Sequence, residues 1–193
     1  MPRPAVFMDR DGTLSHEVGY VNHVSRFRLY PWAVDAVRLA NKTGFLAVVV
    51  TNQAGVARGY FPEAVIHEVH ASLVASMTAG DARLDGIYFC PHHPSAGEPP
   101  YRRDCDCRKP KPGLVERAAA ELDIDLSRSF VIGDRLGDLE LAWRVGARGV
   151  LVRSGYGLGE LTYHAPSWPR QPDLVAENVL EAVERIVAGA SQR

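Results

Sequence analysis

The sequence predicts an α/β fold with a mostly parallel, Rossmann-like sheet and helices on both of its faces. Short apolar runs alternate with segments whose apolar residues recur at helical spacing, which is the pattern of consecutive βαβ units. The runs are apolar throughout, as expected for strands that are covered on both sides. No repeat or linker divides the 193 residues, so we expect a single domain over residues 1–193.

The expected strands and helices follow one another in a regular order. The five apolar runs that predict strands are 5–8, 45–50, 84–89, 129–132 and 149–152. A first helix opens near Pro31, since proline suits the first helical turn, and ends at Gly44. The later helices open at Pro62 and at Pro112 and then cover 139–145 and 174–187. The segment 156–172 is rich in proline and glycine, which predicts a surface connection.

Composition narrows the class of protein. The net charge of −1 gives no electrostatic argument for nucleic acid or an anionic membrane as a partner. No apolar run is long enough to span a bilayer. The residues before Asp9 include one arginine and few apolar side chains, so we expect no signal peptide and a cytoplasmic location. No exposed apolar stripe stands out, and a monomer is expected.

The most informative motif is Asp9-Arg10-Asp11-Gly12-Thr13, directly behind the first apolar run. In a parallel sheet, ligands bind at the carboxyl ends of the strands. Two carboxylates at such an end repel each other unless a cation lies between them. An acidic turn is the plain alternative, because aspartate and glycine are common in turns.

Polar residues follow two further predicted strands. Thr51-Asn52-Gln53 comes after 45–50, and Gly133-Asp134-Arg135-Leu136-Gly137-Asp138 comes after 129–132. The first stretch suits phosphate contacts or simply opens a loop. Asp138 could merely favour the start of its own helix, whereas Asp134 adds a third acid at a strand end. Lys109 could neutralise a phosphate, although a surface position is the commoner fate of a lysine.

Three cysteines, Cys90, Cys105 and Cys107, lie in two close groups, and His92 and His93 follow the first. An odd number of cysteines argues against a disulfide framework. Three thiolates and one imidazole in two close pairs suit a tetrahedral structural Zn²⁺. The spacing does not choose between the two histidines, and three incidental buried cysteines are the alternative.

The order and spacing of four groups of residues resemble the haloacid dehalogenase-like phosphohydrolases over about residues 5–155. The four groups are Asp9 with Asp11, then Thr51, then Lys109, then Asp134 with Asp138. The resemblance implies that Asp9 is a nucleophile that forms an aspartyl-phosphate. It also implies that Asp11 is the general acid and then the base. Mg²⁺ would be held by Asp9, by the backbone carbonyl of Asp11 and by Asp134, with Asp138 in support. The groups that would hold the remaining phosphoryl oxygens are Thr51 and Lys109.

The cysteine loop narrows this resemblance to the D-glycero-D-manno-heptose-1,7-bisphosphate phosphatases and the related histidinol-phosphate phosphatases. The matching stretches are Asp9-Arg10-Asp11-Gly12-Thr13-Leu14, Gly19-Tyr20-Val21, Thr51-Asn52-Gln53-Ala54-Gly55-Val56-Ala57-Arg58-Gly59, Cys90-Pro91-His92-His93-Pro94 and Cys105-Asp106-Cys107-Arg108-Lys109-Pro110. The zinc ligands that the family pattern implies are Cys90, His92, Cys105 and Cys107. The substrate-binding residues that it implies are Glu17, Val18, Gly19, Tyr20, Thr51, Asn52, Gln53, Ala54, Arg108, Lys109 and Arg135.

The chain leaves little room for a separate cap domain. Nineteen residues separate Phe89 from Lys109, and the zinc-binding loop occupies them. The stretch between Leu14 and Phe45 is also short, so we expect an open site whose loops carry the selectivity. The departures from the usual Asn, Ser and Lys of the family are Ser15, Ala54 and Arg135. They bear on the substrate and its anomer rather than on the reaction class.

The first hypothesis is a Mg²⁺-dependent phosphatase that hydrolyses the C7 phosphate of D-glycero-D-manno-heptose 1,7-bisphosphate through an aspartyl-phosphate. The reaction would serve nucleotide-activated heptose biosynthesis, with a small phosphorylated sugar as partner and no nucleic acid or membrane. Histidinol-phosphate phosphatase is the alternative within the same chemistry. A polynucleotide 3′-phosphatase would be expected to show a basic stripe, and a non-catalytic zinc-stabilised module would be expected to lose Asp9 or Asp134.

The remaining histidines, expected on the surface or in loops, are His16, His23, His67, His70 and His164.

Overall fold

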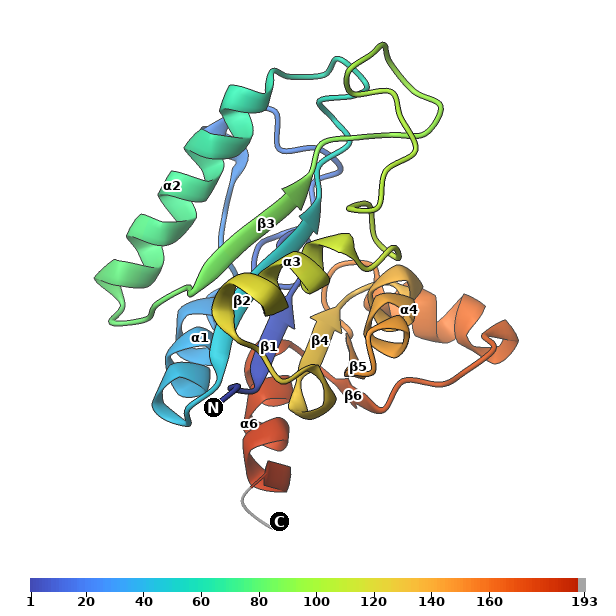
Figure 1. Cartoon of the computed structure of the whole chain (residues 1–193). Helices are drawn as coiled ribbons and strands as arrows, with labels where there is room; N and C mark the ends of the chain where they lie inside the picture. Colours follow the sequence, from blue (N-terminus) through green and yellow to red (C-terminus); the bar gives the residue numbers. More distant parts are fainter. Residues whose placement is uncertain (191–193) are drawn as a thin grey trace.

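The computed structural model describes residues 1–190 and is built around one six-stranded parallel sheet in the order β3-β2-β1-β4-β5-β6 (Figure 1). The strands are β1 (Ala5–Met8), β2 (Leu46–Asn52), β3 (Gly86–Cys90), β4 (Phe130–Gly133), β5 (Arg148–Val152) and β6 (Leu174–Ala176). The predicted fold class is confirmed. The first strand of the chain lies in the middle of the sheet, next to β2 and β4.

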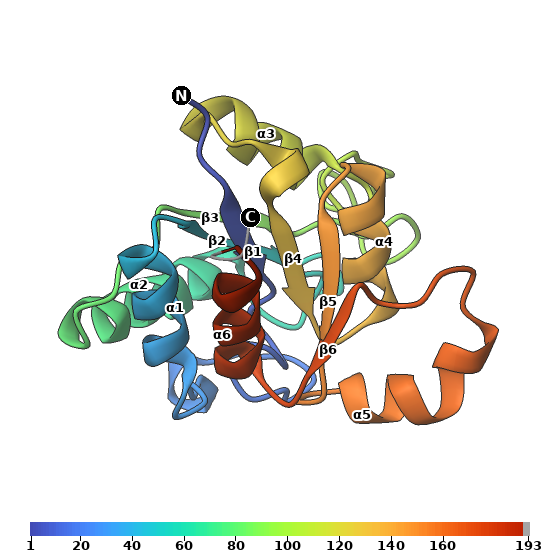
Figure 2. The same ribbon diagram turned by 90° about the horizontal axis from the view of Figure 1, so that it is seen from below.

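Helices cover both faces of the sheet (Figure 2). The helices of one face are α1 (Ala33–Lys42), α2 (Glu63–Ala79) and α6 (Val179–Ala190), and those of the other face are α3 (Gly113–Leu122) and α4 (Leu136–Arg144). Val6 and Met8 of β1 belong to the first core, whereas Ala5 and Phe7 belong to the second. All four side chains are fully buried. Burial on both faces explains why this strand is apolar without alternation.

The C-terminal segment differs from its prediction as one long helix. Leu174–Ala176 pairs with β5 as the edge strand β6, and α6 begins only at Val179. Asn178 separates the two elements. Its Oδ1 accepts hydrogen bonds from the first free backbone amides of the helix, at 3.0 and 3.1 Å. A side chain that satisfies these amides starts a helix, so the earlier start at 174 was wrong.

The segment 156–172 is more structured than the surface connection that we expected. It contains α5 (Gly157–Gly159), a π-helical turn at Glu160–His164 and a 3₁₀ turn at Ala165–Ser167. Together they form an excursion that projects beside the sheet (Figure 2). Trp168 attaches it to the core by packing with Leu139 and Leu151. Two further 3₁₀ turns cover Val24–Arg26 and Leu126–Arg128.

The register of the sheet brings three strand ends together. Met8 of β1 pairs with Val49 of β2 and with Ile132 of β4. The residues that follow these positions, Asp9, Thr51 and Asp134, therefore meet at the carboxyl edge of the sheet, where parallel α/β folds bind ligands. Within residues 1–190, no helix is both long and apolar enough to cross a membrane.

Candidate active site

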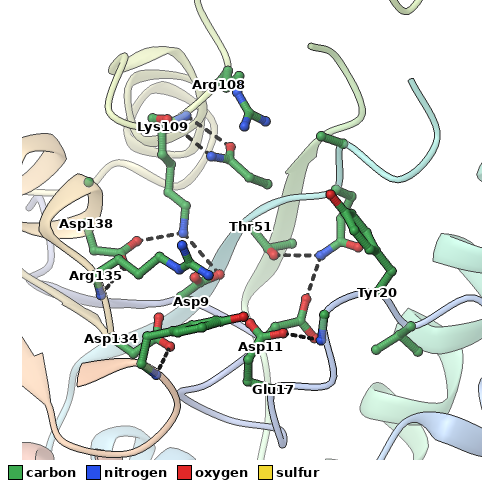
Figure 3. A pocket seen from close by; sticks show the side chains of 17 residues that line it. Asp9, Asp11, Glu17, Tyr20, Thr51, Arg108, Lys109, Asp134, Arg135 and Asp138 are labelled. Atoms are coloured by element: carbon green, nitrogen blue, oxygen red, sulfur yellow. Dashed lines mark hydrogen bonds and ion pairs between the residues drawn. The ribbon is translucent and has the colours of Figure 1, made fainter. Parts of the chain in front are cut away.

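A pocket of about 390 Å³ lies at the carboxyl ends of β1, β2 and β4 (Figure 3). The lining consists of Asp9, Asp11, Glu17, Gly19, Tyr20, Val21, Thr51, Asn52, Gln53, Ala54, Arg108, Lys109, Asp134, Arg135, Gly137, Asp138 and Tyr156. The pocket thus collects all the residues predicted for catalysis and for substrate binding except Val18. The Val18 side chain is exposed, and its carbonyl oxygen accepts a hydrogen bond from Arg26 at 3.4 Å.

Lys109 and two carboxylates form the buried centre of the pocket. The Lys109 Nζ lies 3.0 Å from Asp9 Oδ1 and donates to Asp138 Oδ1 at 2.7 Å. Burial lowers the pKa of the Lys109 ammonium, but the Asp138 and Asp9 charges more than offset burial and raise this pKa above its ordinary value. Burial raises the pKa of Asp9 to about 6 although Lys109 opposes the shift. A cation and a carboxylate therefore lie side by side, an arrangement that suits phosphoryl transfer.

The backbone of Lys109 is fixed by the end of β2. Asn52 Oδ1 accepts a hydrogen bond from the Lys109 amide at 3.0 Å, and Asn52 Nδ2 donates to the Lys109 carbonyl at 3.1 Å. The Lys109 Nζ also donates to the carbonyl of Val50 at 3.0 Å. The lysine is thus held at both its backbone and its side chain by elements of the sheet edge.

Asp134 occupies a cradle that only glycines leave open. Gly12 and Gly155 have φ angles of +82° and +59°, and a Cβ on either would lie 2.0 or 2.2 Å from Asp134 Oδ2. The Tyr156 amide donates to the same oxygen at 2.8 Å, and Ser154 Oγ donates to the Gly12 carbonyl at 2.7 Å. Burial, followed by the Asp9 and Asp138 charges, raises the pKa of Asp134 to about 8.

The acidic centre, defined here as Asp9, Asp134 and Asp138, fits a hard divalent cation. One carboxylate oxygen from each residue lies within 4.8 Å of the others. Asp138 is already engaged, since its Oδ1 accepts from Lys109 and its Oδ2 from the Arg135 amide at 3.3 Å. Asp9 Oδ2 and Asp134 Oδ1 accept no hydrogen bond from any residue within 1–190. Burial first, and then the charges of neighbouring carboxylates, raise the pKa values of Asp9 and Asp134. Two such oxygens suit Mg²⁺.

The Asp11 carboxylate lies on the β2 side of the pocket (Figure 3). Arg10 donates to both of its oxygens, from Nε to Oδ1 at 3.1 Å and from Nη2 to Oδ2 at 2.6 Å. Gln53 Nε2 donates to Asp11 Oδ2 and to Thr51 Oγ1, both at 2.9 Å. Gln53 therefore links the Asp11 carboxylate to the Thr51 hydroxyl.

His70 is not the surface histidine that we expected. Its side chain on α2 is buried, its Nε2 lies 3.3 Å from Arg10 Nη1, and its ring packs edge-on to Phe89 at 5.5 Å. Burial, and next the Arg10 charge, lower the pKa of His70 to about 3, so the ring is neutral and can accept a hydrogen bond from Arg10. The histidines that are exposed as predicted are His16, His23, His67 and His164.

Two guanidiniums and one carboxylate lie in the outer part of the pocket lining. Arg108 Nη1 donates to the His92 carbonyl at 3.3 Å. The Arg135 guanidinium lies 3.8 Å from the centre of the Tyr156 ring, a cation–π contact that fixes its plane. Glu17 Oε1 accepts from the Gly19 amide at 2.5 Å, and burial raises the pKa of Glu17. Guanidiniums held in this way suit a phosphate group.

The cysteine cluster, defined as Cys90, His92, Cys105 and Cys107, lies in and next to the loop between β3 and α3. Its Sγ and Nδ1 atoms lie within 4.8 Å of one another, with four neighbouring pairs at 3.3 to 3.6 Å. Tetrahedral Zn²⁺ with ordinary bond lengths places such ligand atoms roughly 3.5 to 3.8 Å apart. The second histidine, His93, points elsewhere, and its ring nitrogens contact Arg58 and the backbone of 95–96.

Comparisons with known proteins identify the family. The HAD-hydrolase-like family model matches residues 106–182. The D-glycero-beta-D-manno-heptose-1,7-bisphosphate 7-phosphatase of Escherichia coli K12 is 42% identical over 167 residues, which cover 86% of this chain and 87% of that protein. The chain belongs to the heptose-1,7-bisphosphate 7-phosphatase family. The Haemophilus influenzae member is 45% identical over 78% of this chain and 82% of its own length.

Solved structures of the phosphatase family agree in fold. The D,D-heptose 1,7-bisphosphate phosphatase of B. bronchiseptica, complexed with magnesium and phosphate, has a TM-score of 0.85 and 28% identity, covering 96% of this chain and 99% of its own. A HAD-like protein from Mesorhizobium loti has a TM-score of 0.82 and 29% identity, over 100% of this chain and 88% of its own. The resemblance stated from the motifs is therefore confirmed.

Several residues in and around this pocket were missed by the sequence analysis. Ser154, Gly155 and Tyr156 support Gly12 and Asp134, as described above. They follow β5, so the argument from polar residues at strand ends could have found them. Arg10 lay inside the recognised motif, but nothing in the sequence pairs it with a histidine sixty positions later.

Proposed function

We propose that this protein is a Mg²⁺-dependent phosphatase that hydrolyses the C7 phosphate of D-glycero-D-manno-heptose 1,7-bisphosphate through an aspartyl-phosphate, in nucleotide-activated heptose biosynthesis. The observation that carries the proposal is the buried Asp9–Lys109 pair, 3.0 Å apart, with two more carboxylates beside it. The 42–45% identity to named 7-phosphatases supports the substrate.

In the first step, a carboxylate oxygen of Asp9 attacks the phosphorus of the C7 phosphate, and the bond between this phosphorus and the oxygen on C7 breaks. Asp11 gives its proton to that oxygen, which leaves as the hydroxyl of heptose 1-phosphate. Lys109 and Thr51 hold the phosphoryl oxygens while charge develops on them.

In the second step, the Asp11 carboxylate takes a proton from water, and the water oxygen bonds to phosphorus. The bond between phosphorus and Asp9 breaks, so inorganic phosphate forms and the Asp9 carboxylate is restored. Asp11 again carries a proton, and the cycle is closed without any other reactant.

The residues proposed to hold Mg²⁺ are Asp9, the backbone carbonyl of Asp11 and Asp134. When bound, the cation offsets the negative charge of the phosphoryl group. The magnesium and phosphate in the B. bronchiseptica phosphatase support this assignment. The residues proposed to hold a structural Zn²⁺ are Cys90, His92, Cys105 and Cys107.

The sugar would lie between the loop of Glu17, Gly19 and Tyr20 and the two guanidiniums of the lining. Arg108 and Arg135 suit the phosphate that is not transferred, because guanidiniums bind phosphate in a fixed plane. We propose the β-anomer as substrate, since the curated relatives are named for it. The single domain over 1–193, the monomeric state and the cytoplasmic location stay predictions.

Phosphate release from a small panel tests the proposal. The panel contains both anomers of heptose 1,7-bisphosphate, histidinol phosphate and a 3′-phosphorylated oligonucleotide, each with Mg²⁺ or with a chelator, for the parent protein and Asp9→Asn. We expect turnover of the β-anomer that needs Mg²⁺ and falls at least about 10³-fold in Asp9→Asn. Preference for histidinol phosphate would assign the related activity, and no turnover of any phosphate would refute the proposal.

A further inference from the structure

Arg10 is a buried cation between the two motif aspartates. Its side chain is 1% exposed, whereas that of Asp11 is 21% exposed. A buried guanidinium is stable only when its N–H groups are paired. Three partners supply acceptors: the Asp11 carboxylate, Gln53 Oε1 at 2.9 Å and His70 Nε2 at 3.3 Å.

His70 contacts the Arg10 guanidinium from outside the pocket. It reaches the guanidinium from α2, an element that contributes no residue to the pocket lining. Phe89 packs edge-on against its ring, which limits how the ring can turn. Because Nη1 is held by His70 of α2 and Nη2 by Gln53 in the loop after β2, two separate parts of the fold set the plane of the guanidinium.

The plane of Arg10 in turn sets the direction of the Asp11 carboxylate. A fork that donates to both carboxylate oxygens fixes their orientation as well as their position. The Asp11 carboxylate also accepts hydrogen bonds from Gln53 Nε2 at 2.9 Å and from Ser15 Oγ at 3.3 Å. A general acid must deliver its proton along the bond to the leaving oxygen, and a misplacement of about 1 Å can cost roughly 100-fold in rate.

We propose that Arg10 and His70 are positioning residues for the acid–base group Asp11. His70 holds the Arg10 fork in its plane, and the fork aims the Asp11 carboxylate. The inference rests on the proposed role of Asp11 in phosphoryl transfer. His70 does not line the pocket, so its role is one of positioning.

This role makes the effect of His70 depend on the leaving group. A sugar alkoxide is a strong base and needs the proton of Asp11 as it departs, whereas p-nitrophenolate leaves near neutral pH without one. A disturbed Asp11 should therefore slow phosphorylation of Asp9 by a sugar phosphate but not by p-nitrophenyl phosphate. A disturbed nucleophile or fold should slow both.

The experiment compares His70→Leu, which lacks the acceptor, with His70→Gln, whose amide oxygen can replace it. Single-turnover release of the sugar product and the nitrophenol burst are measured for each variant with Mg²⁺. We expect His70→Leu to lose about 10- to 100-fold with the sugar bisphosphate and to keep its burst rate within about twofold. His70→Gln should recover most of the sugar rate. His67→Leu is the matched control, because His67 lies on the same helix, also packs on Phe89 and is 64% exposed.

Equal losses with both phosphates, or no loss with the sugar, would overturn the inference. If His70→Leu does not fold, Arg10→Lys is measured in the same pair of assays, since lysine keeps the charge but cannot form the fork; the same split is expected. If the parent cleaves other alkyl phosphates but not the heptose bisphosphate, the substrate proposal fails. The comparison then proceeds with the alkyl phosphate that is cleaved, so the two failures are distinguishable.

Discussion

The acidic centre and the cysteine cluster are both sets of metal-ligand side chains, but the fold supports them differently. The acidic centre lies directly behind β1 and β4 and in the first turn of α4, and Lys109 bridges two of its carboxylates. The cysteine cluster has only Cys90 on a strand, while its other three members lie in the loop before α3. The acidic centre is therefore placed by the sheet itself, whereas three of the four residues of the cysteine cluster are placed by a loop.

Arg108 and Lys109 directly follow Cys107 and connect the cysteine cluster to the acidic centre along the chain. Lys109 is held by Asn52, Val50, Asp9 and Asp138, all outside the cysteine loop. Arg108 is held instead by the carbonyl of His92, within that loop. We infer that the sheet positions the group for chemistry and the loop positions the group for substrate binding.

The largest expected effect concerns the acidic centre. Asp134→Asn should lower turnover at least about 100-fold, because it removes a proposed Mg²⁺ ligand. In the folded chain burial, and then Asp9 and Asp138, raise the pKa of Asp134 from 3.8 to about 8. Its proton therefore stabilises the fold fully below about pH 4, and this contribution is lost as the pH rises toward 8.

Asparagine stays neutral at every pH, so the stability of the variant relative to the parent should increase as the pH rises. Without metal, the difference in free energy of unfolding should grow by roughly 1 kcal/mol per pH unit between pH 5 and 7. Urea unfolding with a chelator at both pH values measures this. Mg²⁺ should raise the Tm of the parent and not that of the variant. A difference that stays constant with pH would contradict the account of Asp134.

A smaller effect is expected at the support of Lys109. Asn52→Ala removes both hydrogen bonds to the Lys109 backbone, and we expect kcat to fall about 10- to 100-fold. Asn41→Ala is the matched control, because Asn41 makes the same two hydrogen bonds to the backbone of Arg83, at 3.0 and 2.8 Å. Both variants should lose similar stability in thermal unfolding, but only Asn52→Ala should lose activity. Similar kcat values for Asn52→Ala and Asn41→Ala would show that Asn52 does not position Lys109 for catalysis.

The smallest effect on activity is expected at the opposite end of β1. The buried Ser129 Oγ accepts from the Ala5 amide at 2.9 Å and donates to the Asp125 carbonyl at 2.6 Å. Ser129→Ala leaves that amide unpaired and should cost about 1–3 kcal/mol in urea unfolding. The kcat should not change, since the pocket lies at the other end of the strand. Ser127→Ala removes an exposed hydroxyl that donates to Asp125 Oδ1 at 2.6 Å, so it should leave kcat unchanged and cost less stability than Ser129→Ala.

The chemical centre of the pocket was largely predictable from the sequence, because most of its residues lie at the ends of apolar runs whose carboxyl ends must meet in a parallel sheet. Asp9, Thr51 and Asp134 illustrate this. The roles assigned to them stay predictions, but their meeting in one pocket is a structural fact. The gathering of the three cysteines with one histidine also followed from local spacing, although the spacing did not choose between His92 and His93.

Other features could not be predicted because they depend on packing between distant elements. His70 reaches Arg10 only because α2 packs on the face of the sheet behind the motif loop. The apolar residues of β6 continue smoothly into those of α6, so periodicity alone merges the two elements. The cap at Asn178 was the local signal that separates them.

The most direct test of the account separates binding from turnover in a protein without zinc. Cys105→Ser is prepared, its zinc content and fold are checked, and KM and kcat for the sugar bisphosphate are measured with saturating Mg²⁺. Because Arg108 depends on the loop and Lys109 on the sheet, KM should rise about tenfold or more while kcat stays within about threefold. A kcat that falls as far as KM rises, or a variant with unchanged kinetics, would contradict the division of roles between the two clusters.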